Sequence, residues 1–282
     1  MPFIRDLVSE LVGDLARTGS GDFITAVAEP LPLRILTRLV GFSDETVAQL
    51  RRLTQAAMSA DAATPLDDAR REIRELMVHE IEQHRRCPRN DHITSLVHAE
   101  VQGRAITDDE LVAVLTSSAI ADHESTVSAL GSTACVLASR QGLQDAVRQD
   151  PTCIPRFVEE VLRLRTPFHF FARATTRPAR VGDVSIPAGE KVLLSYASAN
   201  RDDEKFAGAD DIDITRGARG HLAFGYGLHH CVGAPVARTE LRLLVEKLCA
   251  LPRLRLDGEP EFTGIQRGSS LGYRRLPVRF AD

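Results

Sequence analysis

The stretch "HLAFGYGLHHCVGAP", residues 221–235, decides how this chain is interpreted. It places a lone cysteine, Cys231, among three glycines and next to two adjacent histidines, His229 and His230. An apolar helical pattern begins immediately afterwards. A thiol at a helix N-terminus lies near the positive end of the helix dipole and near free N–H groups, and both favour the thiolate. These residues alone leave three interpretations of Cys231: a metal ligand, a nucleophile or a structural thiol in a turn.

Composition and charge narrow the class of protein. The 282 residues carry a net charge of −4, and 43% of them are hydrophobic. This near balance argues against a nucleic-acid-binding protein, which usually has a basic face or tail. The sequence has no apolar run of about 18 residues, so we expect no membrane-spanning helix. The five cysteines form no CxxC pair, which argues against a disulfide framework and predicts a reducing, cytoplasmic location.

The N-terminal part has the periodicity of amphipathic helices. A second apolar helix is predicted over 33–41, where Gly41 ends it, and Ser43 is placed to cap a third. A charged amphipathic helix is predicted over 67–86. The first helix, over 3–17, should bury a single apolar face, made of Ile4, Leu7, Val8, Leu11, Val12 and Leu15.

A long central helix is predicted over 107–139. Thr107 and Glu110 have the spacing of a capping box, in which each residue bonds the backbone of the other. The side chains that follow are apolar or small on every side except at 122–124, so we expect the helix to be buried all round. Charges in the middle of such a helix are costly unless they are paired or face a cavity.

The C-terminal part mixes helices with short strands. We expect a helix over 152–165, a β portion over 170–198, polar turns over 200–220 and a last helix over 232–250. Weak strand signals follow. No repeat, low-complexity segment or linker separates these parts, so the sequence predicts one domain over residues 1–282. Its fold class should be mainly α with small β-sheets.

The cysteine loop carries a resemblance to a known family. Residues 224–233 fit the pattern Phe-x-x-Gly-x-His-x-Cys-x-Gly, which resembles the haem-binding loop of the cytochrome P450 family. The resemblance implies that Cys231 is the axial thiolate ligand of the iron in haem b, iron protoporphyrin IX. It also implies that His229 meets a haem propionate. Three further cofactor-binding residues follow from it: Phe224, Gly225 and Gly233.

Other interpretations of the same residues stay open at this point. A zinc site from His229, His230 and Cys231 would need a fourth ligand, and no second cysteine or histidine cluster completes it in the sequence. A structural cysteine is the commonest case for a single cysteine, because most only fill space.

A second motif lies on the helix predicted over 152–165. Glu160 and Arg163 are three residues apart and so share a helix face; alone, they would suggest an exposed pair that contributes about 0.2–1 kcal/mol. The order of motifs resembles the family's Glu-Arg-Arg network, with Arg216 as the third member, which fixes the cysteine loop. Arg173 matches a family position that contacts a haem propionate; without the resemblance it is equally a solvent-facing strand residue.

The central helix carries the residues implied for catalysis. Residues 121–126, Ala-Asp-His-Glu-Ser-Thr, resemble a family segment in which an acid and a hydroxyl deliver protons to bound dioxygen. The resemblance gives these roles to Glu124 and Ser125, whereas the alternative is a buried charge satisfied by neighbouring helices. Asp122 stands where the family usually has glycine, which adds bulk and negative charge there.

The resemblance covers nearly all of this chain, but the chain matches only part of the family's fold. Its first helix resembles one well inside that fold, so the expectation is a cytochrome P450 fold that lacks its N-terminal portion. Such a chain would leave haem exposed on one side. The apolar surface exposed in this way would favour self-association.

The resemblance implies a haem-thiolate monooxygenase of the bacterial type that spans no membrane. It would insert one oxygen atom from dioxygen into a small organic substrate, in secondary metabolism, with electrons from a ferredoxin-type donor. Arg219 and Arg238 would lie on the surface that faces this donor. Two alternatives remain: a non-catalytic P450-like partner that stabilises another enzyme, or an incomplete, inactive chain.

Overall fold

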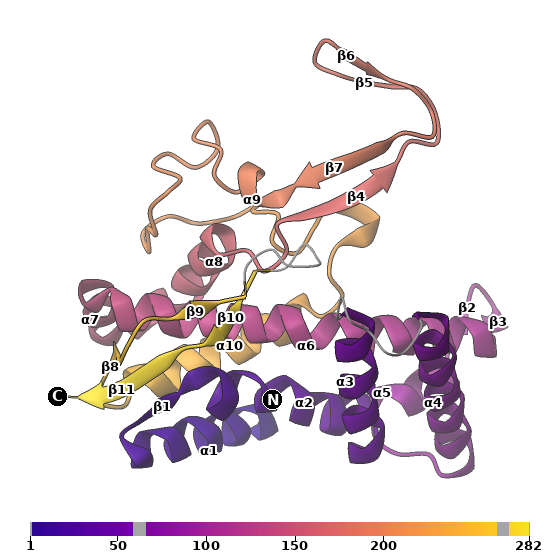
Figure 1. Cartoon of the computed structure of the whole chain (residues 1–282), viewed down its shortest axis with the longest axis horizontal. Coiled ribbons are helices and arrows are strands. Elements are labelled where there is room, and N and C mark those ends of the chain that lie inside the picture. Colours follow the sequence, from indigo (N-terminus) through magenta and orange to yellow (C-terminus); the bar gives the residue numbers. More distant parts are fainter. Residues whose placement is uncertain (1, 59–65, 264–270, 282) are drawn as a thin grey trace. The chain divides into compact units, whose positions relative to one another are not determined.

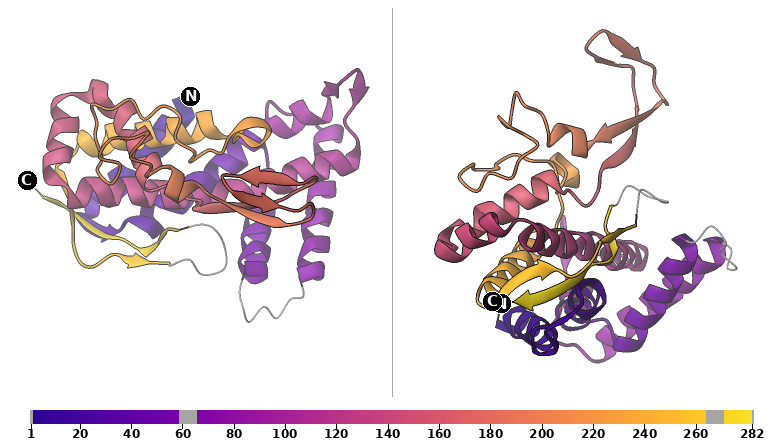
Figure 2. Two further views of the ribbon diagram at one scale, coloured as in Figure 1. Left: turned by 90° about the horizontal axis from the view of Figure 1, so that it is seen from above. Right: turned by 60° about the vertical axis from the view of Figure 1, so that its left-hand side comes forward.

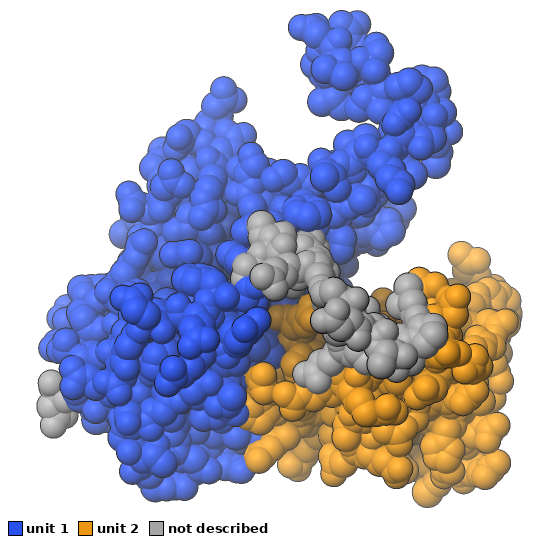
Figure 3. Space-filling view, in the orientation of Figure 1, with its two compact units in different colours: residues 1–28, 125–282 blue, residues 29–124 orange. Residues whose placement is uncertain are grey.

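A computed structural model describes residues 2–58, 66–263 and 271–281 of the chain. The chain forms two compact units, coloured separately in Figure 3. Unit 1 contains residues 1–28 and 125–282, and unit 2 contains residues 29–124. Each unit is described by itself below.

Helix α1 (Pro2–Thr18) and helix α10 (Ala234–Cys249) pack together in unit 1. Arg5 of α1 forms an ion pair with Glu246 of α10, with 2.8 Å between Nη1 and Oε2. The predicted apolar face of α1 is confirmed, because all six of its members are buried: Ile4, Leu7, Val8, Leu11, Val12 and Leu15.

A three-stranded antiparallel sheet joins the two ends of unit 1, in the order β1 (Ser20–Asp22), β11 (Pro277–Ala281) and β8 (Arg253–Leu256). Figure 2 shows the yellow C-terminal strand beside the indigo N-terminal segment. Gln144 on α7 (Gln141–Gln149) fastens this sheet to the helices. Its Nε2 donates to the Leu254 carbonyl oxygen at 2.9 Å, and its Oε1 accepts from the Leu254 N–H at 3.1 Å.

The β portion of unit 1 follows helix α8 (Ile154–Leu164), which a short 3₁₀ turn (Pro151–Cys153) precedes. The antiparallel strands β4 and β7 extend into a hairpin of β5 and β6 that projects from the helices of unit 1 (Figure 1). The remaining elements of this unit are short: η1 (Ile24–Ala28), β4 (Phe170–Ala174), β5 (Ala179–Val181), β6 (Val184–Ile186), β7 (Lys191–Ser195), α9 (Tyr196–Ala199), η4 (Gly227–His229), β9 (Glu261–Phe262) and β10 (Tyr273–Arg275).

Unit 2 is built mainly from helices around one apolar core. This core includes the fully buried side chains of Phe42, Met77, Ile81 and Ile93. The predicted helices are confirmed: α3 starts after Ser43, whose hydroxyl accepts from the Thr46 N–H at 3.1 Å. The elements are α2 (Pro30–Ile35), η2 (Leu36–Val40), α3 (Asp44–Met58), α4 (Leu66–Arg86), α5 (His92–Val97), β2 (Glu100–Val101) and β3 (Arg104–Ala105).

Helix α6 (Asp108–Ser139) begins in unit 2 and continues into unit 1. Its capping box has the predicted form: the Glu110 carboxylate accepts from the Thr107 N–H at 2.9 Å, and the Thr107 hydroxyl accepts from the Glu110 N–H at 3.3 Å. Among the described residues, no helix, α6 included, is long and apolar enough to cross a bilayer.

The expectation that the central helix is buried on every side is wrong for its first half. Val114 and Ile120 are 42% and 46% exposed. The reason is that the unit 2 core covers only the face that carries Leu111, Leu115 and Ala119. The second half does meet the expectation, because Leu130, Ala134 and most of their neighbours are buried.

Asp91 joins two helices of unit 2, α4 and α5. Its Oδ1 accepts from the Thr94 N–H at 2.8 Å and so caps α5, and its Oδ2 lies 3.1 Å from Nε2 of the buried His84 on α4. His84 Nδ1 lies 2.7 Å from the Glu80 carbonyl oxygen. Burial works to raise the pKa of Asp91, but the hydrogen bonds from Thr94 and the contact with His84 outweigh it and lower the pKa.

Replacing Asp91 by asparagine should lower the free energy of unfolding by about 2 kcal/mol at neutral pH, because the amide keeps the cap but removes the negative charge beside His84. The pKa of Asp91 in the folded state lies below that in the unfolded chain. The stabilisation is therefore fully present above about pH 4 and is lost as the pH falls through the folded-state pKa. Urea denaturation of both proteins across this range measures it.

Asp67→Asn is the control, because the Asp67 side chain is 92% exposed in its pair with Arg70. This variant should change the free energy of unfolding by less than about 0.5 kcal/mol. A difference between wild type and Asp91→Asn that does not shrink at low pH contradicts the assignment.

Candidate functional site

Cys231 is exposed in a compact loop between η4 and α10. The Cys231 N–H donates to the Phe224 carbonyl oxygen at 2.9 Å, which closes the loop on itself. Two glycines with left-handed backbone angles allow the chain to turn in this way: Gly225 has φ 70° and Gly227 has φ 68°. Residues other than glycine rarely adopt such angles. The loop residue Gly233 is the N-cap of α10, so Cys231 lies just before the helix N-terminus, as predicted.

The backbone at Gly225 also lies close to the opposite side of the loop. A Cβ atom at this position would lie 3.2 Å from the His229 carbonyl oxygen, closer than most Cβ contacts. Gly225 therefore serves two needs, a positive φ and a close approach of backbone to backbone.

The outer surface of the loop carries uncovered apolar side chains. Tyr226, Leu228 and Val232 are 84%, 102% and 93% exposed. Single exposed apolar residues are ordinary, but three of this size beside an exposed thiol form a surface suited to an apolar group.

A network missed by sequence reasoning lies behind the loop, around Glu159 of α8. The Glu159 carboxylate accepts two hydrogen bonds from Arg238 of α10, at 2.7 and 2.9 Å, and lies 2.9 Å from Nε2 of His221. The Arg238 guanidinium in turn lies over the Phe224 ring, 4.5 Å from its centroid. Only the fold brings these residues together, and no local pattern marks Glu159.

The opposite charges in this network stabilise each other. Burial works to raise the pKa of Glu159, but the hydrogen bonds from His221 and Arg238 outweigh it and lower the pKa to about 2. The pKa of Arg238 is raised, first by its hydrogen bonds to Glu159, against the effect of burial, and then by the charges of Glu159 and Cys231. A cation fixed by a buried acid therefore lies in the electrostatic environment of the thiol.

Glu160 and Arg163 are both fully buried, so this pair is not the exposed ion pair that the isolated motif suggests. Arg163 donates from Nε and Nη2 to the two Glu160 oxygens, at 2.8 and 3.0 Å. Arg216 is near: its Nε lies 3.8 Å from Glu160 Oε2. The remaining donors of Arg163 reach three backbone carbonyl oxygens, those of Asn200, Ala209 and Asp211.

Asn200 connects the network of Glu160 and Arg163 to the cysteine loop. Its carbonyl oxygen accepts from Arg163 at 2.8 Å, and its side-chain oxygen accepts from the Leu222 N–H at 2.6 Å. Glu160 also accepts from the Asp213 N–H at 2.9 Å. The irregular segment 200–222 is therefore held by the pair on α8.

Arg173 lies half-buried on β4, opposite Val192 of β7. Its Nη1 donates to the carbonyl oxygen of Ala172 at 2.9 Å. Among the described residues, none forms an ion pair with Arg173. His229 lies exposed at the end of η4. Both side chains are thus placed where they could meet an anionic group, but neither is fixed by a carboxylate of the described part of this chain.

Glu124 and Ser125 are consecutive residues of α6, where unit 2 ends and unit 1 resumes. Glu124 is exposed and Ser125 is half-buried. The side chain of Asp122 lies outside the described residues. Sequence reasoning missed the neighbouring His123, whose buried Nε2 has no hydrogen-bond partner among the described residues. Burial, and then the charge of Arg51, lower the pKa of His123 against the effect of Glu29.

The comparison with known proteins decides the family. The profile described as Cytochrome P450 matches residues 56–258. The chain belongs to the cytochrome P450 family. It is 33% identical to Cytochrome P450 107B1 of Saccharopolyspora erythraea, over 99% of this chain and 69% of that protein. It is 35% identical to the Erythromycin C-12 hydroxylase of the same organism, over 98% of this chain and 72% of that protein.

Comparison with a solved structure leads to the same conclusion for the fold. The Bacillus subtilis cytochrome P450 PksS of the bacillaene polyketide synthase covers all of this chain with a TM-score of 0.92 and 27% identity, and 74% of that structure is matched. The predicted fold class, mainly α with small β-sheets, and the predicted family are therefore confirmed. Membership makes the chain an oxidoreductase of the P450 monooxygenase type, a type that uses haem.

The residues of the loop fit a P450 haem. The exposed Cys231 offers one sulfur ligand, and the apolar side chains of Leu228 and Val232 lie exposed in the same loop. The zinc alternative finds no support, because no group of three or more His, Cys, Asp or Glu suited to a metal ion occurs among the described residues. A single thiolate with an apolar rim suits a metal already held by a macrocycle.

Replacing Gly225 by alanine should lower the free energy of unfolding by about 2 kcal/mol or more, because the variant adds a steric contact to the cost of a positive φ. It should also speed hydrogen exchange at the Cys231 amide, whose bond to Phe224 closes the loop. Urea denaturation and exchange measured by NMR test the two effects.

Gly189→Ala is the matched control. Gly189 also has a positive φ, 86°, but a Cβ atom there meets nothing within 4 Å. The control should lose only about 1 kcal/mol, the cost of the backbone angle alone, and should leave Cys231 exchange unchanged. Equal losses in the two variants would remove the argument for a close approach at Gly225.

Proposed function

We propose that this chain is a monooxygenase that inserts one oxygen atom from dioxygen into a small organic substrate in secondary metabolism. The observation that carries the proposal is the exposed Cys231, in a loop held by the buried network of Glu160 and Arg163. Relatives named as hydroxylases and epoxidases support it. The substrate of this chain is assigned only as a small organic molecule.

The proposed cofactor is haem b, which when bound supplies the redox chemistry that activates dioxygen. Cys231 would provide the axial thiolate ligand through Sγ. His229 and Arg173 would donate hydrogen bonds to the propionates. The backbone at Gly225 and Gly233 gives the loop its path, and Phe224 would pack beside the sulfur, with the Arg238 guanidinium on its ring.

Protons for the reaction would come through the central helix. The Glu124 carboxyl group would hold a proton, and the Ser125 hydroxyl would donate it onward to the reacting oxygen. Serine retains the hydroxyl of the family's usual threonine without its methyl group. Glu160, Arg163 and Arg216 would not touch the reactants, because their role is to fix the loop that carries the ligand.

The proposed partners are a ferredoxin-type electron donor and the organic substrate. Arg219 is exposed at the edge of the segment held by the α8 network, and a cationic surface there would attract an acidic donor. Self-association is proposed through exposed apolar side chains of β4 and β7, such as Phe171 and Leu193. The cytoplasmic location stays a prediction.

Reducing the purified, haem-supplied chain and adding carbon monoxide should produce the red-shifted Soret band of a thiolate-ligated haem. Cys231→Ser should abolish this shifted band, because a hydroxyl does not supply the thiolate. The absorption spectrum of each protein measures the outcome.

Cys87→Ser is the control, since Cys87 is also exposed but lies outside the loop. It should leave the band unchanged. A chain that takes up no haem contradicts the proposal and favours a non-catalytic partner or an inactive chain. A shifted band that persists in Cys231→Ser overturns the ligand assignment.

A further inference from the structure

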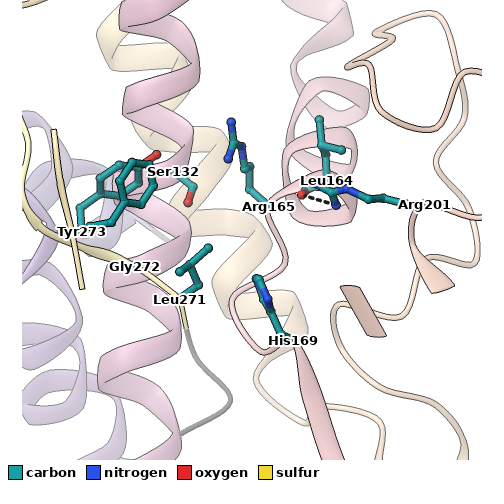
Figure 4. Close-up of a pocket in the computed structure, with 9 residues that line it drawn as sticks. Ser132, Leu164, Arg165, His169, Arg201, Leu271, Gly272 and Tyr273 are labelled. Carbon is teal, nitrogen blue, oxygen red and sulfur yellow. Dashed lines mark hydrogen bonds between the residues drawn. The ribbon is translucent and has the colours of Figure 1, made fainter. Parts of the chain in front are cut away.

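Unit 1 contains a small pocket whose described lining includes no residue of the cysteine loop (Figure 4). We call it the Arg165 pocket. It lies between Ser132 of α6, the end of α8 at Leu164 and Arg165, and the segment that contains Leu271 and Tyr273. None of its lining residues belongs to the haem, ligand or proton-delivery assignments above.

The charge in the lining of this pocket comes from two arginines. Two guanidinium groups, those of Arg165 and Arg201, and the imidazole of His169 line it. No aspartate or glutamate is among the described residues that line it. Such an arrangement is unfavourable for an empty pocket, because like charges repel, and favourable for a pocket that holds a negative charge.

Arg165 gives the strongest indication that the pocket binds a ligand. Its guanidinium makes no hydrogen bond or ion pair with any residue of the described part of the chain. A guanidinium carries five N–H donors, and half-buried arginines normally pair with an acid or a carbonyl. Figure 4 shows the Arg165 side chain standing between the central helix and the end of α8.

Two contacts within unit 1 hold the Arg201 side chain in place. Its Nη1 donates to the Leu164 carbonyl oxygen at 3.0 Å, and its Nε lies 3.3 Å from the Asp210 carboxylate. The Asp210 side chain is 89% exposed, so its charge is largely screened by water. Arg201 therefore has a set orientation and a positive charge that no buried acid neutralises.

Two neighbouring groups stay uncharged beside the guanidinium groups. Burial and then the charge of Arg201 lower the pKa of His169. Burial, and then the contact with Cys135, raise the pKa of Tyr273 although Arg165 works to lower it, so the phenol keeps its proton. The Ser132 hydroxyl makes no hydrogen bond with any described residue and can donate one to a ligand.

The pocket is too small for a whole organic substrate. Its volume is about 50 Å³, whereas pockets for drug-sized ligands measure about 300–1,000 Å³. A single water needs about 10–15 Å³ on a comparable measure. The space therefore suits a group of a few heavy atoms.

We propose that the Arg165 pocket binds one small oxyanion group, a carboxylate, phosphate or sulfate, between the guanidinium groups of Arg165 and Arg201, with His169 and Ser132 beside it. The shared chemistry is a planar or tetrahedral set of oxygen acceptors that matches the donor fork of arginine. Such a group could be a free inorganic anion or the anionic end of a longer organic molecule.

Calorimetric titration of the haem-loaded chain, in a buffer free of other oxyanions, tests the proposal. Inorganic phosphate, sulfate and acetate are the probes. We expect one site that weakens at high salt. Arg165→Gln should reduce its affinity about tenfold or more, the loss expected when charge-assisted hydrogen bonds are removed. The Arg165 side chain makes no hydrogen bond or ion pair with any described residue, so this variant should fold.

Arg180→Gln is the matched control. It removes the same charge from the β5–β6 hairpin, where the Arg180 side chain is 68% exposed, and should leave the affinity unchanged. His169→Asn removes a second lining side chain and should also weaken binding. No binding by any probe, or equal binding by wild type and Arg165→Gln, overturns the proposal.

Alkyl carboxylates of increasing length distinguish the two sources of the anion. Affinity that rises with chain length, together with a shift of the haem Soret band, identifies the anionic end of an organic ligand. Affinity independent of length, without a spectral shift, identifies a free anion. The carbon monoxide spectrum of the same samples reports the haem site separately, so a failure of the anion site is not confused with a failure of the proposed function.

Discussion

Glu160 and Arg163 form the buried ion pair on which the rest of the site depends. Both side chains are fully buried, and removing either partner would leave an uncompensated charge in the interior. The pair does more than satisfy itself, because Arg163 also donates to three carbonyl oxygens between residues 200 and 211. That segment has almost no regular secondary structure to hold it, so side-chain hydrogen bonds supply its position.

Helix α8 reaches the cysteine loop from two directions. Glu159 and Glu160 are adjacent in sequence, and successive residues of a helix point about 100° apart. Glu160 therefore faces the 200–216 segment, while Glu159 holds His221 and Arg238 on either side of the loop. Asn200 adds a bond to the loop entrance at Leu222. One helix thus fixes both the entry and the exit of the loop that exposes Cys231.

Local patterns were sufficient for the elements whose structure depends on near neighbours. The apolar face of α1 and the capping box at Thr107 and Glu110 follow from helix geometry alone, and both appear as predicted. The burial of α6 did not follow in the same way. Its first half exposes Val114 and Ile120, because an apolar helix face is buried only where another element covers it.

The sequence by itself determined the helices, the strand-rich segment, the family pattern around Cys231 and the membership that this pattern implies, because these depend on residue type and short spacing. Only the tertiary structure decided which charges meet. Glu159 with Arg238, and Arg163 with the carbonyl oxygens near 200–211, each join distant segments, and Arg201 lines the same pocket as Arg165. Long-range contacts of this kind depend on how elements pack, and a single sequence carries no local signal for them.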